Sequence, residues 1–210
     1  MRALPPEVDI TTPPARGAVD PGESDLLAKA QGGNLFAFEE IVRRYQRRVY
    51  GTALRIVRRH DLADDVVQDA FLRAYQALGR FDRQRPFGPW ICRIAANLAV
   101  NHVRSPESRE QALPESLAET PTAEPGPLGA VLESEGREAL DRAMDRLSPE
   151  QRAVFVLRVF EELSYQEIAD ALDISPGTVM SRLSRARARL REALTPYLGV
   201  AMRRAGGGPA

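Results

Sequence analysis

The 210-residue sequence is poor in the residues that build catalytic and metal sites. It has one cysteine, Cys92, and two histidines, His60 and His102. A lone cysteine forms neither an intramolecular disulfide nor a multi-cysteine metal site, which fits a reducing compartment, and we expect the cytoplasm. The histidines stand at helix-surface spacing without paired carboxylate or cysteine ligands. We therefore expect no catalytic residue, no metal site and no cofactor.

Long apolar runs and phosphate-cradling glycine loops are also absent from the sequence. A membrane-spanning helix needs about 18 or more consecutive apolar residues, so we expect no membrane insertion. The start of the sequence lacks the charged and then apolar order of a secretion signal. Residues 1–23 are rich in proline and small residues, and residues 205–210 are mostly glycine. Both ends are expected to be disordered.

Charge is balanced overall but unevenly distributed. The formal net charge is zero, yet residues 24–104 hold fourteen Lys or Arg against eight Asp or Glu, and residues 105–135 hold seven Glu against Arg109 alone. A basic module is thus followed by an acidic, proline-rich connector. We expect an all-α protein with two small helical domains, residues 24–104 and 136–196. They are joined by the flexible acidic linker 105–135 and followed by a flexible tail, 197–210.

The segment from Ser164 to Arg189 has the pattern of a helix-turn-helix. Ser164 and Glu167 form a capping box, which marks the start of a helix. Ser175 with the following proline opens a second helix, and Asp173 and Ile174 leave room only for a tight turn. Two capped helices around a short turn are typical of proteins that bind duplex DNA.

The second helix of this motif has a polar face opposite its apolar stripe. Hydroxyls near its N-terminus and guanidinium groups behind them can read base edges and hold phosphates. An arginine-rich helix is often only a solvated surface, but the paired caps favour DNA binding. The candidate DNA-binding residues are Thr178, Ser181, Arg182, Arg185 and Arg189.

The first half of the chain predicts a helical hairpin. Apolar spacing indicates a long helix from Leu35 to Arg59, then a second helix that Asp61 caps and Gly79 ends. The buried side of the second helix is expected to include Tyr75. Its outer face carries a continuous polar strip, for which the residues alone favour a solvated surface. The strip consists of Asp65, Gln68, Asp69 and Arg73.

An irregular stretch then mixes aromatic residues with arginines, and Pro89 starts another helix. Aromatics interleaved with arginines are typical of single-stranded nucleic-acid binding. Phe87 and Trp90 nevertheless stand at core positions, so we interpret them as core. The outer face of this helix and the preceding loop are the candidate nucleic-acid surface. Its residues are Arg83, Arg85, Arg93, Asn97, Asn101 and Arg104.

Taken in order, these segments resemble an extracytoplasmic-function sigma factor of the sigma-70 family. The resemblance covers roughly residues 25–104 and 137–194 and rests on three motifs. They are DLADDVVQDAFLRAY from Asp61, FGPWICRIAANLAVNHVR from Phe87 and LSPEQRAVFVLRVFEELSYQEIA from Leu147. The order and separation of the motifs make the combination specific.

The resemblance implies a non-catalytic specificity subunit whose partners are core RNA polymerase, through its beta and beta-prime subunits, promoter DNA and an anti-sigma factor. The strip Asp65, Gln68, Asp69 and Arg73 would dock on the coiled coil of the largest polymerase subunit. The surface from Arg83 to Arg104 would recognise and melt the minus-ten element. The helix-turn-helix would read the minus-thirty-five element.

The family's linker threads through the active-site cleft and RNA exit channel of the polymerase, so linker glutamates would mimic RNA charge. These are Glu107, Glu110, Glu115, Glu119 and Glu124. Three positions depart from the family pattern. Met180 stands where Lys or Arg is common, and Ala96 and Asn101 stand where Arg and Asp are frequent, so the promoter sequence is not inferred.

Two other classes of protein remain open at this point. A DNA-binding regulator of the response-regulator output type shares the recognition-helix pattern but explains nothing before Ser105. An enzyme with a DNA-binding tail would need a catalytic constellation, and Asp64 and Asp65 are better interpreted as charges near a helix start. Specific initiation when the chain is added to core polymerase would argue against a stand-alone regulator. Turnover of a nucleotide substrate would indicate an enzyme.

Overall fold

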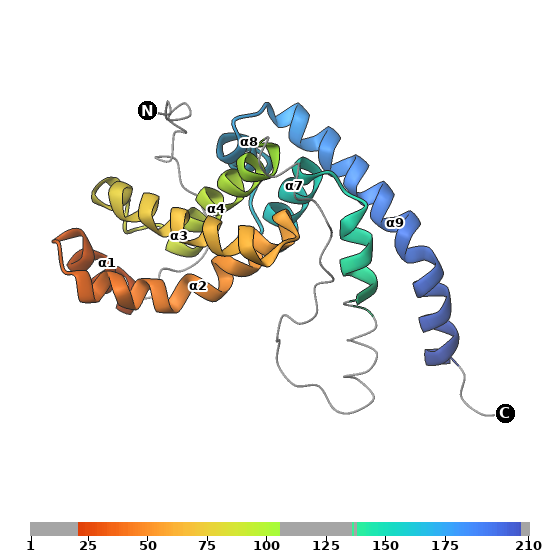
Figure 1. Ribbon diagram of the computed structural model, residues 1–210, viewed down its shortest axis with the longest axis horizontal. Coiled ribbons are helices and arrows are strands. Elements are labelled where there is room, and N and C mark those ends of the chain that lie inside the picture. The colour runs from red at the N-terminus through yellow and green to blue at the C-terminus, as the bar shows by residue number, and fades with distance from the viewer. Residues whose placement is uncertain (1–20, 106–135, 137, 207–210) are drawn as a thin grey trace.

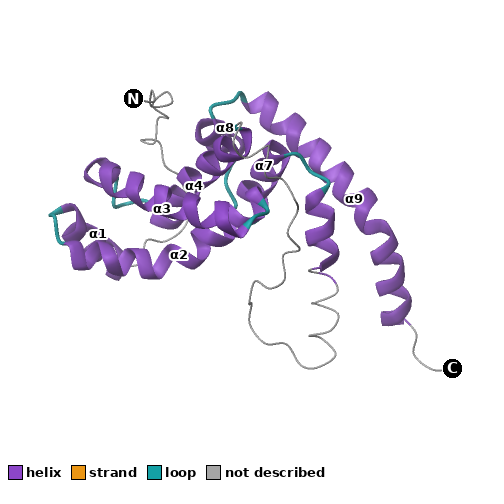
Figure 2. Cartoon of the chain, viewed as in Figure 1, coloured by secondary structure: helices purple, strands orange, loops and turns teal. Residues whose placement is uncertain are grey.

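A computed structural model describes residues 21–105, 136 and 138–206 of the chain. Within these residues all regular secondary structure is helical, as expected (Figures 1 and 2). The expected linker glutamates, from Glu107 to Glu124, and most of the expected disordered N-terminus lie outside the described residues.

The first half of the molecule is a packed group of helices. It contains α1 (Pro21–Gln31), α2 (Leu35–Val57), α3 (His60–Ala77) and α4 (Phe87–Arg104), with a short 3₁₀ helix, η1 (Leu78–Arg80), after α3. Helices α2, α3 and α4 pack against one another in pairs. The largest fully buried side chains here are Trp90, Phe87, Leu27, Ile41 and Ile56.

The predicted hairpin is present, with different ends. Asn34 caps α2 by accepting from Ala37 N, and Arg58 ends the helix in a left-handed conformation with φ 61°. Asp61 does not cap α3, which begins one residue before it. The N-cap is Arg59, and Asp61 lies in the first turn and pairs with the Arg59 guanidinium. Gly79 lies inside η1, after the end of α3.

Helix α1, which the sequence pattern did not predict, anchors the start of α4. The buried Glu23 carboxylate accepts hydrogen bonds from Tyr45 Oη at 2.6 Å and from Phe87 N at 3.3 Å. No side chain of its own N-cap residue bonds to the start of α4. Glu23 therefore acts as a distant capping carboxylate at a helix N-terminus. Helix α4 begins at Phe87, two residues before the expected Pro89.

The second half contains a helical segment at 138–145, followed by α7 (Pro149–Val159), α8 (Tyr165–Leu172) and α9 (Pro176–Gly206). The predicted capping box of Ser164 and Glu167 starts α8, and Ser148 and Gln151 form a second one at α7. Asp173, with φ 50°, ends α8 before the tight turn. The predicted helix-turn-helix is confirmed. Helix α9 continues through 197–206, which we expected to be part of a flexible tail.

The two halves pack against each other. Helix α7 contacts α2 and α4, and α8 contacts α4. Figure 1 shows α1 to α4 at one end of the molecule and α7 to α9 at the other, with α8 against α4. Buried residues of both halves belong to one hydrophobic cluster. The sequence predicted two domains on a flexible linker but did not predict this contact.

Candidate nucleic-acid interface

The polar strip of α3 is largely open to solvent. Asp65 and Gln68 are exposed, whereas Asp69 and Arg73 are half-buried. Asp69 Oδ2 lies 3.4 Å from Nε2 of His102 on α4, so this carboxylate faces the neighbouring helix. Asp65 and Gln68 are thus the strip residues best placed to meet a partner.

Two apolar side chains extend this strip and were missed by the sequence reasoning. Leu72 is 56% exposed and Tyr75 is 39% exposed. The expectation that Tyr75 lies on the buried side is wrong. Its ring packs edge-on against that of Phe38, with the ring centroids 4.9 Å apart, but the residue remains partly open to solvent. The spacing of 65, 68, 72 and 75 puts all four positions on one helical stripe, which was the available signal.

The aromatic residues around the loop before α4 form a buried cluster. The ring centroid of Phe81 lies 4.6 Å from that of Trp90 and 5.5 Å from that of Phe87. All three residues are buried, which confirms the core interpretation of Phe87 and Trp90. The loop exposes Arg83, and Arg85 Nε donates to Asp82 Oδ2 at 3.2 Å.

The α4 face predicted to be open is turned toward the second half of the molecule. Arg93 is only 3% exposed, so the prediction that it lies on an open face is wrong for this arrangement. Asn97 Nδ2 donates to the Ala171 carbonyl of α8 at 2.8 Å, and Arg104 Nε donates to Glu150 Oε1 of α7 at 3.0 Å. Asn101 is exposed and bonds to Asn97.

A buried carboxylate, Glu161, lies at the centre of the contact between the halves. It belongs to the turn between α7 and α8, and its side chain is 4% exposed. Arg48 donates to Glu161 Oε2 from Nη2 at 2.7 Å and from Nε at 2.9 Å, and Thr52 Oγ1 donates to Oε1 at 2.9 Å. A Cβ atom at Gly88 would overlap the Arg48 guanidinium, so this glycine leaves the room that Arg48 occupies.

The Glu161 carboxylate shifts the pKa of nearby groups. Burial is the largest single effect and lowers the pKa of Arg48, but the attraction and hydrogen bond of Glu161, together with smaller contributions from Cys92 and Tyr45, outweigh it and leave the pKa raised. Burial, followed by repulsion from Glu161, raises the pKa of the Cys92 thiol, which is fully buried. Thr52 Oγ1 also lies 3.6 Å from Cys92 Sγ. The thiol is therefore a neutral core group at neutral pH.

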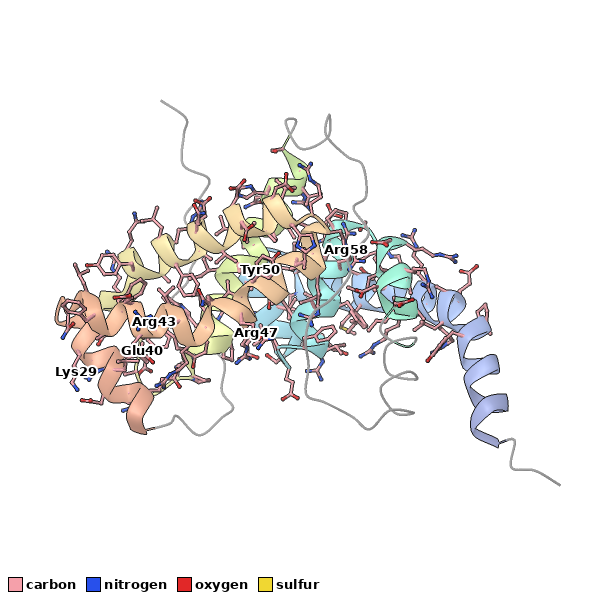
Figure 3. The ribbon with its side chains drawn as sticks, turned by 60° about the horizontal axis from the view of Figure 1, so that its bottom comes forward. Lys29, Glu40, Arg43, Arg47, Tyr50 and Arg58 are labelled. Atoms are coloured by element: carbon pink, nitrogen blue, oxygen red, sulfur yellow. The ribbon has the colours of Figure 1, made fainter. Side chains whose placement is uncertain are left out.

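A second polar cluster lies where α2 ends. The buried Arg58 donates from Nε to Asp145 at 2.7 Å and from Nη1 to Asp141 at 3.0 Å. Arg58 Nη2 also donates to the Asp141 carbonyl at 3.0 Å. Figure 3 shows Arg58 where α2 meets the helices of the second half. Next to this cluster, the Arg55 guanidinium lies 4.4 Å from the Phe160 ring centroid.

Helix α9 holds its polar residues in a local network at its start. Ser175 Oγ accepts from Thr178 N at 3.1 Å and lies 2.9 Å from the Thr178 hydroxyl. Ser181 Oγ donates to the Thr178 carbonyl at 3.1 Å, and Arg185 reaches Ser181 Oγ at 3.4 Å. Ser175 therefore acts as the N-cap that the sequence predicted.

The arginines of α9 differ in their surroundings. Arg189 Nη1 donates to Gln151 Oε1 at 2.9 Å and to the Arg146 carbonyl at 3.3 Å, so its guanidinium bridges to the start of α7. Arg185 is exposed and Arg182 is half-buried. The sequence reasoning did not name Arg187 and Arg191, which are exposed on the same side of α9 as Met180, itself 55% exposed.

Comparison with known proteins identifies the family. The chain is 35% identical over 184 residues to the RNA polymerase sigma-H factor of Pseudomonas aeruginosa, covering 84% of this chain and 95% of the relative. It is 34% identical over 181 residues to the ECF RNA polymerase sigma-E factor of Escherichia coli, covering 82% and 94%. The chain belongs to the extracytoplasmic-function sigma factors of the sigma-70 family.

Family models and solved structures agree with this assignment. Residues 41–110 of this sigma factor match sigma-70 region 2, and residues 137–190 match sigma-70 region 4. CnrH, solved in complex with the cytosolic domain of CnrY, aligns with a TM-score of 0.55 and 28% identity over 83% of this chain and 97% of CnrH. RpoE from Bartonella quintana, solved with the anti-sigma factor NepR, aligns with a TM-score of 0.57 and 25% identity, covering 75% and 96%.

This sigma factor is thus a specificity subunit that directs promoter-specific initiation by RNA polymerase. Among the described helices, none is long and apolar enough to cross a membrane. Across the same residues no group of three or more His, Cys, Asp or Glu side chains is arranged to hold a metal ion.

Proposed function

We propose that the α3 strip is the main docking surface for core RNA polymerase. Asp65 and Gln68 offer an exposed acid and amide, and Leu72 and Tyr75 add exposed apolar area beside them. A surface that combines an apolar centre with directional polar groups suits a specific protein interface. Asp69 and Arg73 complete the strip at its half-buried edge.

Helix α9 is the proposed reader of the minus-thirty-five element. Its capped start presents Thr178, Ser181 and Arg182, and Arg185 lies one turn further on. Guanidinium groups at these positions can bond guanine edges or phosphates. Arg189 is better suited to fixing the helix on α7, because its guanidinium already bonds Gln151.

The α4 face and the loop before it are the proposed minus-ten surface. Asn97, Asn101 and Arg104 stand along one side of α4, and the loop contributes Arg83 and Arg85. Amide and guanidinium groups can bond the edges of bases that have left the duplex. The second half of the molecule must move away for DNA to reach Asn97, because its amide bonds Ala171.

The remaining assignments follow from this role. We propose that the chain catalyses no reaction, needs no cofactor and works in the cytoplasm with the polymerase. An anti-sigma factor is its proposed regulator, since RpoE, a structural relative, was solved with the anti-sigma factor NepR. The family assignment over both regions is the observation that carries the proposal.

Separate variants of the two surfaces test this division of roles. Arg182→Ala should lower transcription from a mapped promoter about tenfold, the range for losing one bidentate base contact, and leave core binding intact. Asp65→Asn should instead weaken core binding. Arg142→Ala is the matched control, because it removes an exposed arginine whose ion pair within the described residues is with Glu138 of its own helical segment. Loss of core binding in Arg182→Ala would contradict the division.

A further inference from the structure

Helix α9 exposes a large apolar side chain close to its start. Met180 is 55% exposed, whereas Val179 and Leu183 of the same helix are buried. Met180 is the fifth residue of α9, so it lies within the first two turns of the helix. Its side chain contributes little to the core of the protein. A partner that covers Met180 therefore removes apolar surface from water that the free chain leaves exposed.

Met180 lies level with the groups that are proposed to read bases. It stands between Thr178 and Ser181 in the chain, and successive residues advance about 1.5 Å along a helix axis. The N-terminal residues of a recognition helix are the ones that reach base edges in the major groove. When α9 binds the minus-thirty-five element as proposed above, Met180 is therefore within reach of base edges.

The hydroxyl groups at this helix start already have hydrogen-bond partners within the chain. Thr178 Oγ1 lies 2.9 Å from Ser175 Oγ, and Ser181 Oγ donates to the Thr178 carbonyl at 3.1 Å. Polar contact with bases therefore falls mainly to the guanidinium groups of Arg182 and Arg185. Guanidinium groups suit the two major-groove acceptors of guanine.

The composition of α9 limits how the helix can recognise an adenine·thymine pair. Asparagine and glutamine, the side chains that bond adenine bidentately, are absent from residues 176–206 of the sequence. The other distinctive feature of this pair in the major groove is the C5 methyl group of thymine, which is recognised by apolar contact. Met180 supplies an exposed apolar group, and its unbranched thioether side chain adapts to the shape of a partner.

We propose that Met180 reads a thymine methyl group in the minus-thirty-five element. The methyl group and the thioether side chain leave water together, and the contact distinguishes thymine from cytosine, which lacks the methyl group. The element that this chain recognises therefore contains a thymine, on either strand, whose methyl group contributes to binding. This inference rests on the proposed function of α9 and adds an apolar reader to its arginines.

The test replaces thymine by deoxyuridine, which lacks the C5 methyl group and keeps the same base pairing. The probe is a labelled promoter duplex, mapped by transcript-start sequencing, in which the thymines of the minus-thirty-five element are replaced one at a time on either strand. Holoenzyme assembled from core polymerase and the full chain is titrated with each duplex at one salt concentration. The series is repeated with Met180→Gln, which keeps a similar side-chain length but is polar, and with Met180→Leu, which stays apolar.

We expect the wild type to bind one uridine duplex about fourfold more weakly than the thymine duplex, the effect of one methyl-sized apolar contact. Met180→Gln should bind these two duplexes equally, and Met180→Leu should retain the difference. Arg187→Ala is the matched control, because Arg187 is exposed on the same side of α9 as Met180. It should keep the ratio of the two affinities, whatever its effect on each of them.

A uridine effect that persists in Met180→Gln would overturn the inference. An element without any thymine, or a wild-type holoenzyme that binds every uridine duplex as tightly as the thymine duplex, would also overturn it. If Thr178→Ser abolished the effect and Met180→Gln did not, the reader of the methyl group would be Thr178. Equal affinity of the wild-type holoenzyme for the promoter and for a duplex with a scrambled minus-thirty-five element would instead contradict the proposed function of α9.

Discussion

At the residue scale, the least satisfied group in the described residues is Arg152 of α7. Its Nε is a buried side-chain nitrogen without a hydrogen-bond partner. Burial, and then repulsion from Arg58, lowers the pKa of Arg152 to about 10. A lowered pKa means that the folded protein disfavours the charged form. The charge of the Arg152 guanidinium therefore lowers the free energy of unfolding at neutral pH. This destabilisation is relieved only as the pH rises through about 10.

Arg152→Met should stabilise the fold. Methionine fills a similar volume without a buried charge, and such replacements are worth about 1 kcal/mol or more. The free energy of unfolding from urea titration is the measurement. Arg142→Met, at an exposed arginine, should change this free energy by about 0.5 kcal/mol or less. A larger loss of stability in Arg152→Met than in Arg142→Met would contradict this account.

The sequence predicted interactions between residues that are close along the chain better than interactions between residues that are far apart. The caps at Ser164 and Ser175 were predictable because the interacting groups lie three residues apart. The burial of Phe87 and Trp90 agrees with the interpretation that both stand at core positions. Asp61 was misassigned as a cap because the Arg59 guanidinium engages its carboxylate. That competition is not visible in capping patterns.

At the element scale, α1 organises the loop that leads to the minus-ten surface. Gln31 Nε2 donates to the Leu78 carbonyl at 2.9 Å and to the Phe81 carbonyl at 2.8 Å. The sequence did not predict this helix, because its functional contacts are with chain about 50 residues away, and Glu23 reaches Phe87 across 64 positions. Local periodicity carries no information on such contacts.

Gln31→Ala should destabilise the first half and loosen the loop. Two carbonyl groups lose their donor, which costs about 1–2 kcal/mol. The loss is measured by urea titration, with promoter opening in the holoenzyme followed by permanganate reactivity of unpaired thymines. Gln46→Ala removes an exposed glutamine of α2 and serves as the control. If the two variants were equally stable and opened promoters equally well, Gln31 would not have this role.

Helix α7 contacts α4 through the Glu150 carboxylate, which pairs with Arg104. The pKa of this carboxylate depends on that contact. Burial raises the pKa of Glu150, but hydrogen bonds from its own backbone N–H, from Arg104 and from Ser148, together with the charge of Arg104, outweigh this effect and leave the pKa lowered from 4.5. A carboxylate whose pKa is lowered in the folded state stabilises the fold above about pH 4.5. This stabilisation is lost as the pH falls through the pKa of the folded state.

The stability difference between wild type and Glu150→Gln should therefore be largest near neutral pH and shrink as the solution is acidified below about pH 4.5. Thermal unfolding at a series of pH values measures it. Arg104→Ala should reduce this pH dependence, because it removes one of the groups that lower the pKa. A difference that stays constant from neutral to acid pH would show that the Glu150 carboxylate does not contribute.

At the scale of the whole molecule, the packing of the two halves was beyond sequence reasoning. Arg48 and Glu161 are 113 positions apart, and Asn97 and Ala171 are 74 apart. Each half can form its helices from local pattern alone, so nothing in that pattern required the halves to meet. This is why the open face predicted for Arg93 is buried. Prediction of the helix-turn-helix and of the α3 strip needed no information about contacts between the two halves.

The central claim is that this chain gives core RNA polymerase its promoter specificity. The most direct measurement is run-off transcription in which the purified chain is added to core enzyme on templates mapped by transcript-start sequencing. The account predicts a discrete transcript that depends on both promoter elements and disappears with Asp65→Asn at limiting core enzyme. Binding of the chain to duplex DNA without any specific transcript would contradict the claim and favour a stand-alone DNA-binding regulator.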